Sequence, residues 1–153
     1  MKIMVVSDSH GAESLFFKAV ECELEDLSHL FFLGDGADDF IRIRDSFPGI
    51  NVAAVKGNCD FFSQFNTMDI MTVFGKQFFY THGHIYGVKE GIDRLVSASM
   101  GACADAVLYG HPHCPLVETR NGFLIMNPGA MKFGSYGIIT LENGELKGKI
   151  KCI

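Results

Sequence analysis

Hydrophobic and polar positions follow two different periods in the first third of the chain. Short runs rich in β-branched or aromatic residues predict three buried strands, over Met1–Val6, Leu30–Leu33 and Asn51–Val55. Between these strands, the spacing of apolar residues predicts amphipathic helices over Glu13–Asp26 and Ala37–Phe47. This alternation of strand and helix is typical of a parallel α/β layer.

The rest of the chain has a pattern richer in strands. Three pairs of apolar segments are separated by short turns that contain glycine, which is typical of β-hairpins. The pairs are Met68–Phe74 with Gln77–Thr81, Leu116–Thr119 with Phe123–Met126, and Tyr136–Leu141 with Leu146–Ile150. A further helix is predicted over Gly87–Met100 and a buried strand over Ala106–Tyr109. Together these elements predict an α/β fold in which two mixed β-sheets pack face to face with flanking helices, as one domain over residues 1–153.

Composition and charge narrow the class of protein. Hydrophobic residues make up 48% of the 153 residues and charged residues 20%, which is typical of a folded globular chain. The formal net charge of −5, without a basic stripe, argues against a nucleic acid polymer as partner. No apolar run approaches the roughly 20 residues of a membrane-spanning helix, so no membrane association is expected. The five cysteines are odd in number and form no C-x-x-C pair, so we expect a cytoplasmic protein without a disulfide framework.

Five of the six histidines fall directly after predicted strands. They form three short segments, Asp8-Ser9-His10, His82-Gly83-His84 and His111-Pro112-His113. In an extended chain, residues two apart point to the same side, so each segment can direct two side chains at one metal ion. Random placement of the histidines would give only roughly 0.2 His-x-His pairs in such a chain. For any one pair, the alternative to metal binding is that the residues are ordinary polar loop histidines beside a glycine turn.

Oxygen ligands follow two more predicted strands. Asp35 comes after the second strand, and Asn58 and Asp60 come after the third. Because ligand sites in open α/β sheets gather at the carboxyl ends of strands, these side chains and the histidines are expected to meet. A mixed nitrogen and oxygen set without thiolate suits Mn, Fe, Co, Ni or Zn better than Ca or Mg.

The motifs carry a specific resemblance when they are taken in order. They read Asp8-Ser9-His10, Gly34-Asp35-Gly36-Ala37-Asp38, Gly57-Asn58-Cys59-Asp60, His82-Gly83-His84 and Gly110-His111-Pro112-His113. This series resembles the calcineurin-like metallophosphoesterase superfamily. The short chain and the Gly-Asn-Cys-Asp variant are most similar to its small YfcE-type phosphodiesterases.

The resemblance implies a centre of two divalent metal ions, with Mn the first choice and Ni, Co, Fe or Zn as alternatives. The first ion would be held by Asp8, His10, Asp35 and His113, and the second by Asp35, Asn58, His82 and His111, so that Asp35 bridges them. Asn58, His84 and Asp60 are the expected catalytic residues. Asp38, Asp60 and His84 match motif positions whose side chains orient the metal ligands without binding the metal themselves. For Asp38 the alternative is an ordinary acidic residue in the first turn of a helix.

The resemblance also implies a function. It predicts a metal-dependent phosphoesterase, in the first place a phosphodiesterase, in which a hydroxide that bridges the metals attacks the phosphorus of a small phosphate ester. The alternative is a non-catalytic metal-binding scaffold or protein-interaction module, because the same fold resembles a retromer scaffold subunit. The resemblance is compatible with a homodimer or a homotetramer.

Two further features bear on specificity. Cys59 stands where many superfamily members have histidine, and a neutral thiol is a poorer proton donor. We therefore expect a preference for esters with good leaving groups, unless His84 or a metal-bound water supplies the proton. The paired phenylalanines of the chain are expected mostly in the core. For Phe61 and Phe62, which follow the Asn58 loop, the alternative is the rim of a substrate site or a subunit contact.

Overall fold

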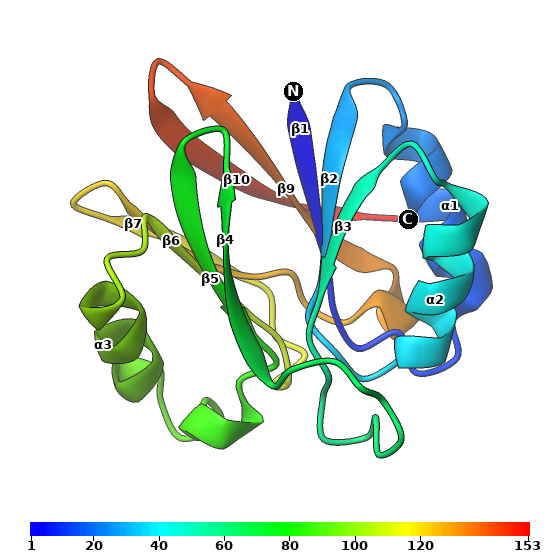
Figure 1. Cartoon of the computed structure of the whole chain (residues 1–153), viewed down its shortest axis with the longest axis horizontal. Helices are drawn as coiled ribbons and strands as arrows, with labels where there is room; N and C mark the ends of the chain where they lie inside the picture. Colours follow the sequence, from blue (N-terminus) through cyan, green and yellow to red (C-terminus); the bar gives the residue numbers. More distant parts are fainter.

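The computed structural model describes residues 1–153, which form two five-stranded β-sheets packed face to face (Figure 1). The first sheet has the order β10-β9-β1-β2-β3, and the second has the order β4-β5-β6-β8-β7. Helices lie on the outer face of each sheet, as Figure 1 shows. The predicted α/β architecture is therefore confirmed.

The first sheet combines the start and the end of the chain. Its strands are β1 (Lys2–Val6), β2 (Leu27–Phe32), β3 (Asn51–Ala54), β9 (Ser135–Glu142) and β10 (Glu145–Cys152). The first three are parallel, whereas the hairpin of β9 and β10 is added antiparallel to β1. This return of the last hairpin to the N-terminal sheet makes the sheet mixed.

The middle of the chain forms the second sheet. Its strands are β4 (Met68–Val73), β5 (Lys76–Thr81), β6 (Ala106–Tyr109), β7 (Leu116–Arg120) and β8 (Phe123–Asn127). β5, β6 and β8 are parallel, and β4 and β7 are antiparallel strands at the two edges. The hairpins of β4 with β5 and of β7 with β8 are the predicted ones.

Three hydrophobic clusters hold the layers together. The central cluster lies between the sheets and includes Val5 and Phe31 from the first and Phe78 and Leu108 from the second. A second cluster buries the inner faces of α1 (Glu13–Glu23) and α2 (Ala37–Ser46) on the first sheet, and a third buries α3 (Asp93–Gly101) on the second. Burial of these apolar faces is the main favourable contribution to folding.

The third predicted helix is shorter than its sequence pattern indicates. The prediction began this helix at Gly87, but the α-helix begins at Asp93, after a single 3-10 turn at His84–Tyr86. Gly87 has φ 66° and Gly91 has φ 157°, and neither value is compatible with a right-handed helix. The glycines therefore keep the segment between β5 and α3 as a loop.

The surface differs from the prediction at one pair of phenylalanines. Phe61 and Phe62 are 82% and 97% exposed, so they are not part of the core.

The five cysteines are all free and exposed. No helix in the structure combines the length and the hydrophobicity that crossing a membrane requires.

A buried carboxylate joins α1 to both ends of the chain. Glu23 is only 2% exposed; it accepts hydrogen bonds from Lys2 Nζ at 2.9 Å, from Tyr136 Oη at 2.9 Å and from Lys151 Nζ. Burial by itself would raise the pKa of Glu23, but the hydrogen bonds from Lys151, Lys2 and Tyr136 outweigh it and lower the pKa from 4.5 to about 2. The ionised carboxylate therefore stabilises the fold.

We expect Glu23→Gln to lower the free energy of unfolding by about 2 kcal/mol at neutral pH. Because the folded pKa lies below the unfolded one, this contribution is complete above about pH 4.5 and is lost as the pH falls toward 2. Urea unfolding of both proteins between pH 3 and pH 7 would measure the difference. Glu21→Gln, on the exposed side of the same helix, is the control and should change little; an equal loss for Glu23→Gln at every pH would contradict the assignment.

Candidate metal centre

The candidate metal centre lies where strands of both sheets end, at the lower edge of the molecule in Figure 1. Its residues come from the loops that follow β1, β2, β3, β5 and β6. The imidazole of His82, after β5, joins the two sheets, because its Nδ1 lies 2.7 Å from the carbonyl oxygen of Leu33, after β2. The predicted convergence of five strand ends is thus present in the structure.

An unusual backbone conformation is concentrated at these strand ends. Five of the seven predicted metal ligands have left-handed φ angles between 44° and 82°, namely Asp8, His10, Asp35, His111 and His113. Such conformations are uncommon for residues other than glycine and are found preferentially at functional sites. They turn the chain after the strand, and Asp8 and His10, two residues apart, reach the same donor group.

Glycines make the close approach of these loops possible. Gly34 has φ 96°, and a Cβ atom there would collide with the backbone of Gly57, at the end of the neighbouring strand. A Cβ atom on Gly110 would collide with the side chain of Ser7. The loops can therefore lie side by side only because these positions carry no side chain.

One group of donor atoms belongs to Asp8, His10 and His113. Their ligand atoms lie within 4.8 Å of one another. His113 Nε2 is 2.9 Å from Asp8 Oδ1, and His10 Nε2 is 3.6 Å from the same oxygen. Asp8 is fully buried, whereas the side chains of His10 and His113 are 28% and 29% exposed. The group is thus open to solvent on its imidazole side.

A second group belongs to Asp35, His82 and His111, whose ligand atoms also lie within 4.8 Å of one another. His82 Nε2 is 3.4 Å from Asp35 Oδ2 and 3.2 Å from His111 Nδ1. The amide oxygen of Asn58 joins this group, at 3.1 Å from His82 Nε2. Three imidazole or amide donors and one carboxylate therefore face one point.

Asp35 lies between the two groups. Its Oδ2 is 3.4 Å from His82 Nε2 in the second group and 3.8 Å from His10 Nε2 in the first. Its Oδ1 accepts a hydrogen bond of 2.8 Å from the backbone N–H of Cys59. All seven predicted ligands are thus brought together, with Asp35 at the centre.

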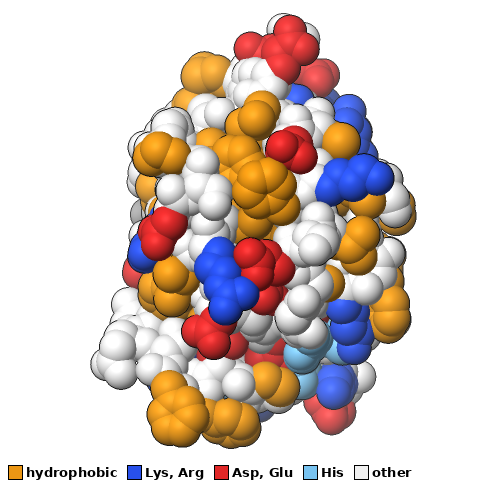
Figure 2. Space-filling model, turned by 90° about the vertical axis from the view of Figure 1, so that its right-hand side faces the viewer, with side chains coloured by type: hydrophobic (Ala, Val, Ile, Leu, Met, Phe, Trp, Pro, Cys, Tyr) orange, Lys and Arg blue, Asp and Glu red, His pale blue; other side chains and the backbone are white.

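The charges at the centre fit bound cations. Asp8 is 0% and Asp35 3% exposed, and the ion-pair partners of both are histidines, with no lysine or arginine among them. Burying two carboxylates is costly unless positive charge compensates them. Figure 2 shows histidine atoms at the surface, low on this face of the molecule, so the imidazole side of the centre reaches solvent whereas its two carboxylates are buried. The donor set fits divalent metal ions.

Surrounding groups fix which atom of each donor faces the centre. Asp8 Oδ2 accepts hydrogen bonds from Ser7 Oγ at 2.6 Å and from the backbone N–H of His111 at 3.1 Å, which leaves Oδ1 for the metal. His82 donates its Nδ1–H to the carbonyl of Leu33, so that Nε2 is the atom that would present a lone pair to a metal when the ring is neutral. These contacts orient the donors before any metal binds.

The pKa values of the imidazoles differ within this small space. For His82, burial opposes the charged form, but hydrogen bonding to Asp35 and the charges of Asp8 and Asp35 outweigh it and raise the pKa. For His84 and His111, burial and then the nearby His82 lower the pKa. Neutral imidazole is the form that binds metal, and a divalent cation would itself favour that form.

Asp60 lies outside both donor groups, although sequence analysis names it as catalytic. Its Oδ2 accepts hydrogen bonds from the backbone N–H groups of Asp35 at 2.7 Å and Gly57 at 2.8 Å. Its Oδ1 accepts from Gly36 and Ala37, both at 2.9 Å, at the first turn of α2. Asp60 therefore joins the loops after β2 and β3 and caps a helix whose own N-cap residue is glycine.

His84 and Asp38 take less central positions than the ligands. The ring centre of His84 is 5.4 Å from that of His82 and 6.2 Å from that of His111. Its Nδ1 is buried and has no hydrogen-bond partner. Asp38 is exposed in the first turn of α2. His84 thus borders the second donor group, and Asp38 lies farther along the surface.

Asp39 was not among the predicted site residues. This carboxylate is 6% exposed, and its Oδ2 accepts hydrogen bonds from Ser9 Oγ at 2.5 Å and from the backbone N–H of Gly11 at 2.8 Å. It therefore fixes the loop that carries His10 to α2. The available signal was the position of Asp39 on the buried face of the predicted helix, where an unpaired carboxylate would be costly.

Cys59 lies beside the predicted metal ligands, although it is not one of them. Its Sγ is within 4.8 Å of ligand atoms of His10 and Asp35, and the side chain is exposed. Burial and then the adjacent Asp35 raise the pKa of the thiol. Cys59 therefore faces the centre as a neutral thiol at neutral pH.

Comparisons with known proteins show the family to which the chain belongs. Residues 1–144 match the family model of the calcineurin-like phosphoesterase superfamily domain. The probable metallophosphoesterase YsnB of Bacillus subtilis is 31% identical and covers 94% of this chain and 86% of its own. The phosphodiesterase YfcE of Escherichia coli is 28% identical and covers 91% and 87%, respectively.

Solved structures are similar over almost the entire chain. A predicted phosphoesterase from Streptococcus pneumoniae superimposes with a TM-score of 0.80 at 23% identity, over 99% of this chain and 88% of that one. Vacuolar Protein Sorting 29 from Cryptosporidium parvum superimposes with a TM-score of 0.76 at 15% identity, over 98% and 96%. At these identities the structures show a common fold.

Proposed function

Because this chain belongs to the calcineurin-like phosphoesterase superfamily, we propose that it is a metal-dependent phosphodiesterase that acts on a small phosphate ester. The observation that carries the proposal is the pair of buried carboxylates, Asp8 and Asp35, which face imidazoles and have no lysine or arginine partner. A site with this charge and donor set is suited to two divalent cations. The name of YfcE supports a diester as substrate.

Each residue has a defined place in this proposal. The first ion is assigned to Asp8, His10, Asp35 and His113, and the second to Asp35, Asn58, His82 and His111. When bound, two divalent ions would lower the pKa of a coordinated water and would offset negative charge on the phosphate in the transition state. Mn²⁺ is the first candidate for both positions, with Ni, Co, Fe and Zn as alternatives.

The remaining residues act around the ligands. Asn58 adds an amide oxygen beside His82 and is exposed, so it can also contact the phosphate. Asp60 keeps Asp35 and the Asn58 loop in place through four backbone hydrogen bonds. His84 is half-buried, and its ring lies 5.4 Å from that of His82 and 6.2 Å from that of His111, so we assign to this imidazole the transfer of a proton to the leaving group.

The experiment measures metal content and hydrolysis on the same preparation. We expect about two metal ions per chain, and hydrolysis of bis(p-nitrophenyl) phosphate with Mn²⁺, Ni²⁺ or Co²⁺, faster than hydrolysis of the monoester p-nitrophenyl phosphate. His111→Ala should lose metal and activity together. Bound metal without hydrolysis of any ester under any metal would contradict the enzyme and favour the non-catalytic scaffold.

The thiol at position 59 gives a prediction about the leaving group. A neutral thiol is a poor general acid, so hydrolysis should slow steeply for esters of less acidic alcohols unless His84 supplies the proton in its place. We expect Cys59→His to raise kcat for diphenyl phosphate about tenfold and to change bis(p-nitrophenyl) phosphate hydrolysis little. Cys59→Ser, which adds no better acid, is the control. An equal gain for both esters would show that the histidine acts in some other way than by protonating the leaving group.

A further inference from the structure

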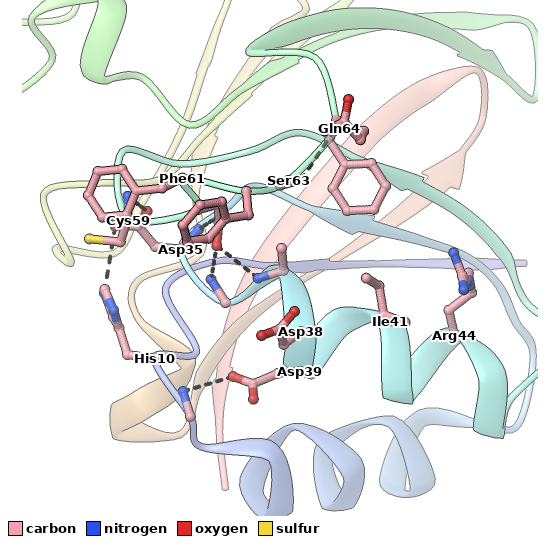
Figure 3. Close-up of a pocket in the computed structure, with 16 residues that line it drawn as sticks. His10, Asp35, Asp38, Asp39, Ile41, Arg44, Cys59, Phe61, Ser63 and Gln64 are labelled. Carbon is pink, nitrogen blue, oxygen red and sulfur yellow. Dashed lines mark hydrogen bonds and ion pairs between the residues drawn. The ribbon is translucent and has the colours of Figure 1, made fainter.

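A cavity of about 690 Å³ opens beside the metal centre. Most of the residues that line it are not predicted metal ligands. It shares His10, Asp35 and Cys59 with the centre and extends along α2 to Ile41 and Arg44 (Figure 3). A cavity of this volume is in the range of small-molecule sites and exceeds what a phosphate group needs. The space therefore fits a further part of the substrate.

Two exposed phenyl rings form the outer wall of this cavity. Phe61 and Phe62 line it and are 82% and 97% exposed. Adjacent phenylalanines that are this exposed are unusual in a soluble chain with an otherwise well-packed core, and such rings are typical of a binding surface. They offer flat apolar faces within reach of the metal centre.

The loop that carries the rings is anchored on both sides. Before them, Asp60 is held by four backbone N–H groups. After them, Phe65 packs edge-to-face on the buried ring of Phe40, with 5.7 Å between the ring centres, and the backbone N–H of Lys56 donates to Asn66 at 2.9 Å. The loop therefore holds Phe61 and Phe62 at the cavity by its fixed ends.

The charges of the cavity limit what it can hold. Its lining contains the carboxylates of Asp38, Asp39 and Asp60 against one arginine, Arg44, which is already paired with Asp45 at 2.8 Å. A second phosphate group would meet mainly negative charge there. Asp38 is exposed, without a hydrogen-bonding or ion-pairing partner in the structure, so it can accept a hydrogen bond from a ligand hydroxyl or amino group.

We propose that this cavity binds a planar, uncharged aromatic group of a phosphodiester substrate, such as an aryl or nucleoside group, against Phe61 and Phe62. The inference rests on the proposed phosphodiesterase function and specifies the substrate class. Stacking on aromatic side chains is tolerant of the exact ring, and it provides affinity without adding charge. The phosphate would lie at the metal centre and the ring in the cavity beside it.

The test uses two diesters with the same leaving group, p-nitrophenyl phenyl phosphate and p-nitrophenyl methyl phosphate. Because p-nitrophenol leaves in both, a difference in kcat/KM reports on the retained phenyl or methyl group. We expect the Mn²⁺-loaded wild-type protein to prefer the phenyl ester about tenfold. The double variant F61A/F62A should lose most of this preference by slowing only the phenyl ester. Phe133→Ala removes a phenylalanine that is 71% exposed beside His113, and it is the control that should keep the preference.

The possible outcomes separate the two proposals. If the wild type hydrolyses neither ester, the phosphodiesterase function fails, and the assignment of the cavity fails with it. If both esters are hydrolysed but F61A/F62A keeps the wild-type preference, or slows both equally, only the assignment of the cavity is overturned. A lower molecular mass of this variant in solution, with unchanged preference, would assign the two rings to contact between copies of the chain.

Discussion

Asp35→Asn is expected to lower kcat/KM for an aryl phosphodiester by about a thousandfold or more. Asp35 lies between both donor groups, with Oδ2 at 3.4 Å from His82 Nε2 and at 3.8 Å from His10 Nε2. Asparagine has the same shape, but it lacks the negative charge and has only one oxygen. One substitution thus removes a donor shared by the two proposed metal positions.

The structure also predicts how the amide would be oriented. Asp35 Oδ1 accepts a hydrogen bond from the backbone N–H of Cys59, so the single oxygen of asparagine would be drawn to that N–H. The NH₂ group would then face the imidazoles and repel a cation. We expect metal content to fall from about two ions per chain to one or fewer.

Thermal unfolding with and without Mn²⁺ separates loss of metal from loss of fold. Wild type should gain stability from the metal, because a ligand that binds only the folded state raises the free energy of unfolding. The variant should gain much less. Asp93→Asn removes an exposed carboxylate in the first turn of α3 and is the control, with wild-type metal content and activity. Two bound ions and retained activity in Asp35→Asn would contradict the bridging position.

Asp60→Asn is expected to lower the free energy of unfolding by about 3 kcal/mol and to lower activity more than tenfold. The two oxygens of Asp60 accept four backbone hydrogen bonds, two at the start of α2 and one each from Asp35 and Gly57. An amide has only one accepting oxygen, so it can keep two of these four hydrogen bonds. Its NH₂ group would leave two N–H donors unsatisfied in a partly buried place.

Kinetics distinguish a positioning role of Asp60 from a direct one. If Asp60 acts through Asp35 and the Asn58 loop, the variant should bind metal more weakly, and its pH–rate profile should keep the wild-type shape. If Asp60 were a general acid or base, one limb of the profile would disappear while metal affinity stayed normal. Asp93→Asn is again the matched control, since Asp93 also occupies a first helical turn but makes no such contacts, and its effect should stay below about 1 kcal/mol.

Much of the candidate site could be predicted from local sequence, because its parts are short motifs at strand ends. The carboxyl ends of neighbouring parallel strands lie at a common edge of the sheet. Once β1, β2 and β3 are recognised, Asp8, Asp35 and Asn58 are therefore expected to lie near one another. The His-x-His segments after β5 and β6 follow the same geometry. The match of residues 1–144 to the superfamily confirms the resemblance carried by these motifs.

Other features depend on contacts that no local pattern encodes. Asp39 and most of the Asp60 contacts depend on backbone N–H groups 23 to 28 residues away, so their neighbours in sequence do not reveal their roles. Phe61 and Phe62 have the composition of core residues, yet their loop projects them to the surface beside a cavity. Which apolar side chains are buried depends on which surfaces face each other in the fold.

The amino-acid sequence by itself determined the strands, most helices and the motifs of the metal centre, because hydrophobic period, glycine position and turn type act over a few residues. Only the tertiary structure decided how the hairpins were distributed between the sheets. The hairpin of β9 and β10 pairs with β1, which lies more than 100 residues earlier, whereas the similar hairpin of β7 and β8 joins the other sheet. Both hairpins are two apolar segments joined by an Asn-Gly turn, so the choice of partner rests on packing between distant strands rather than on local preference.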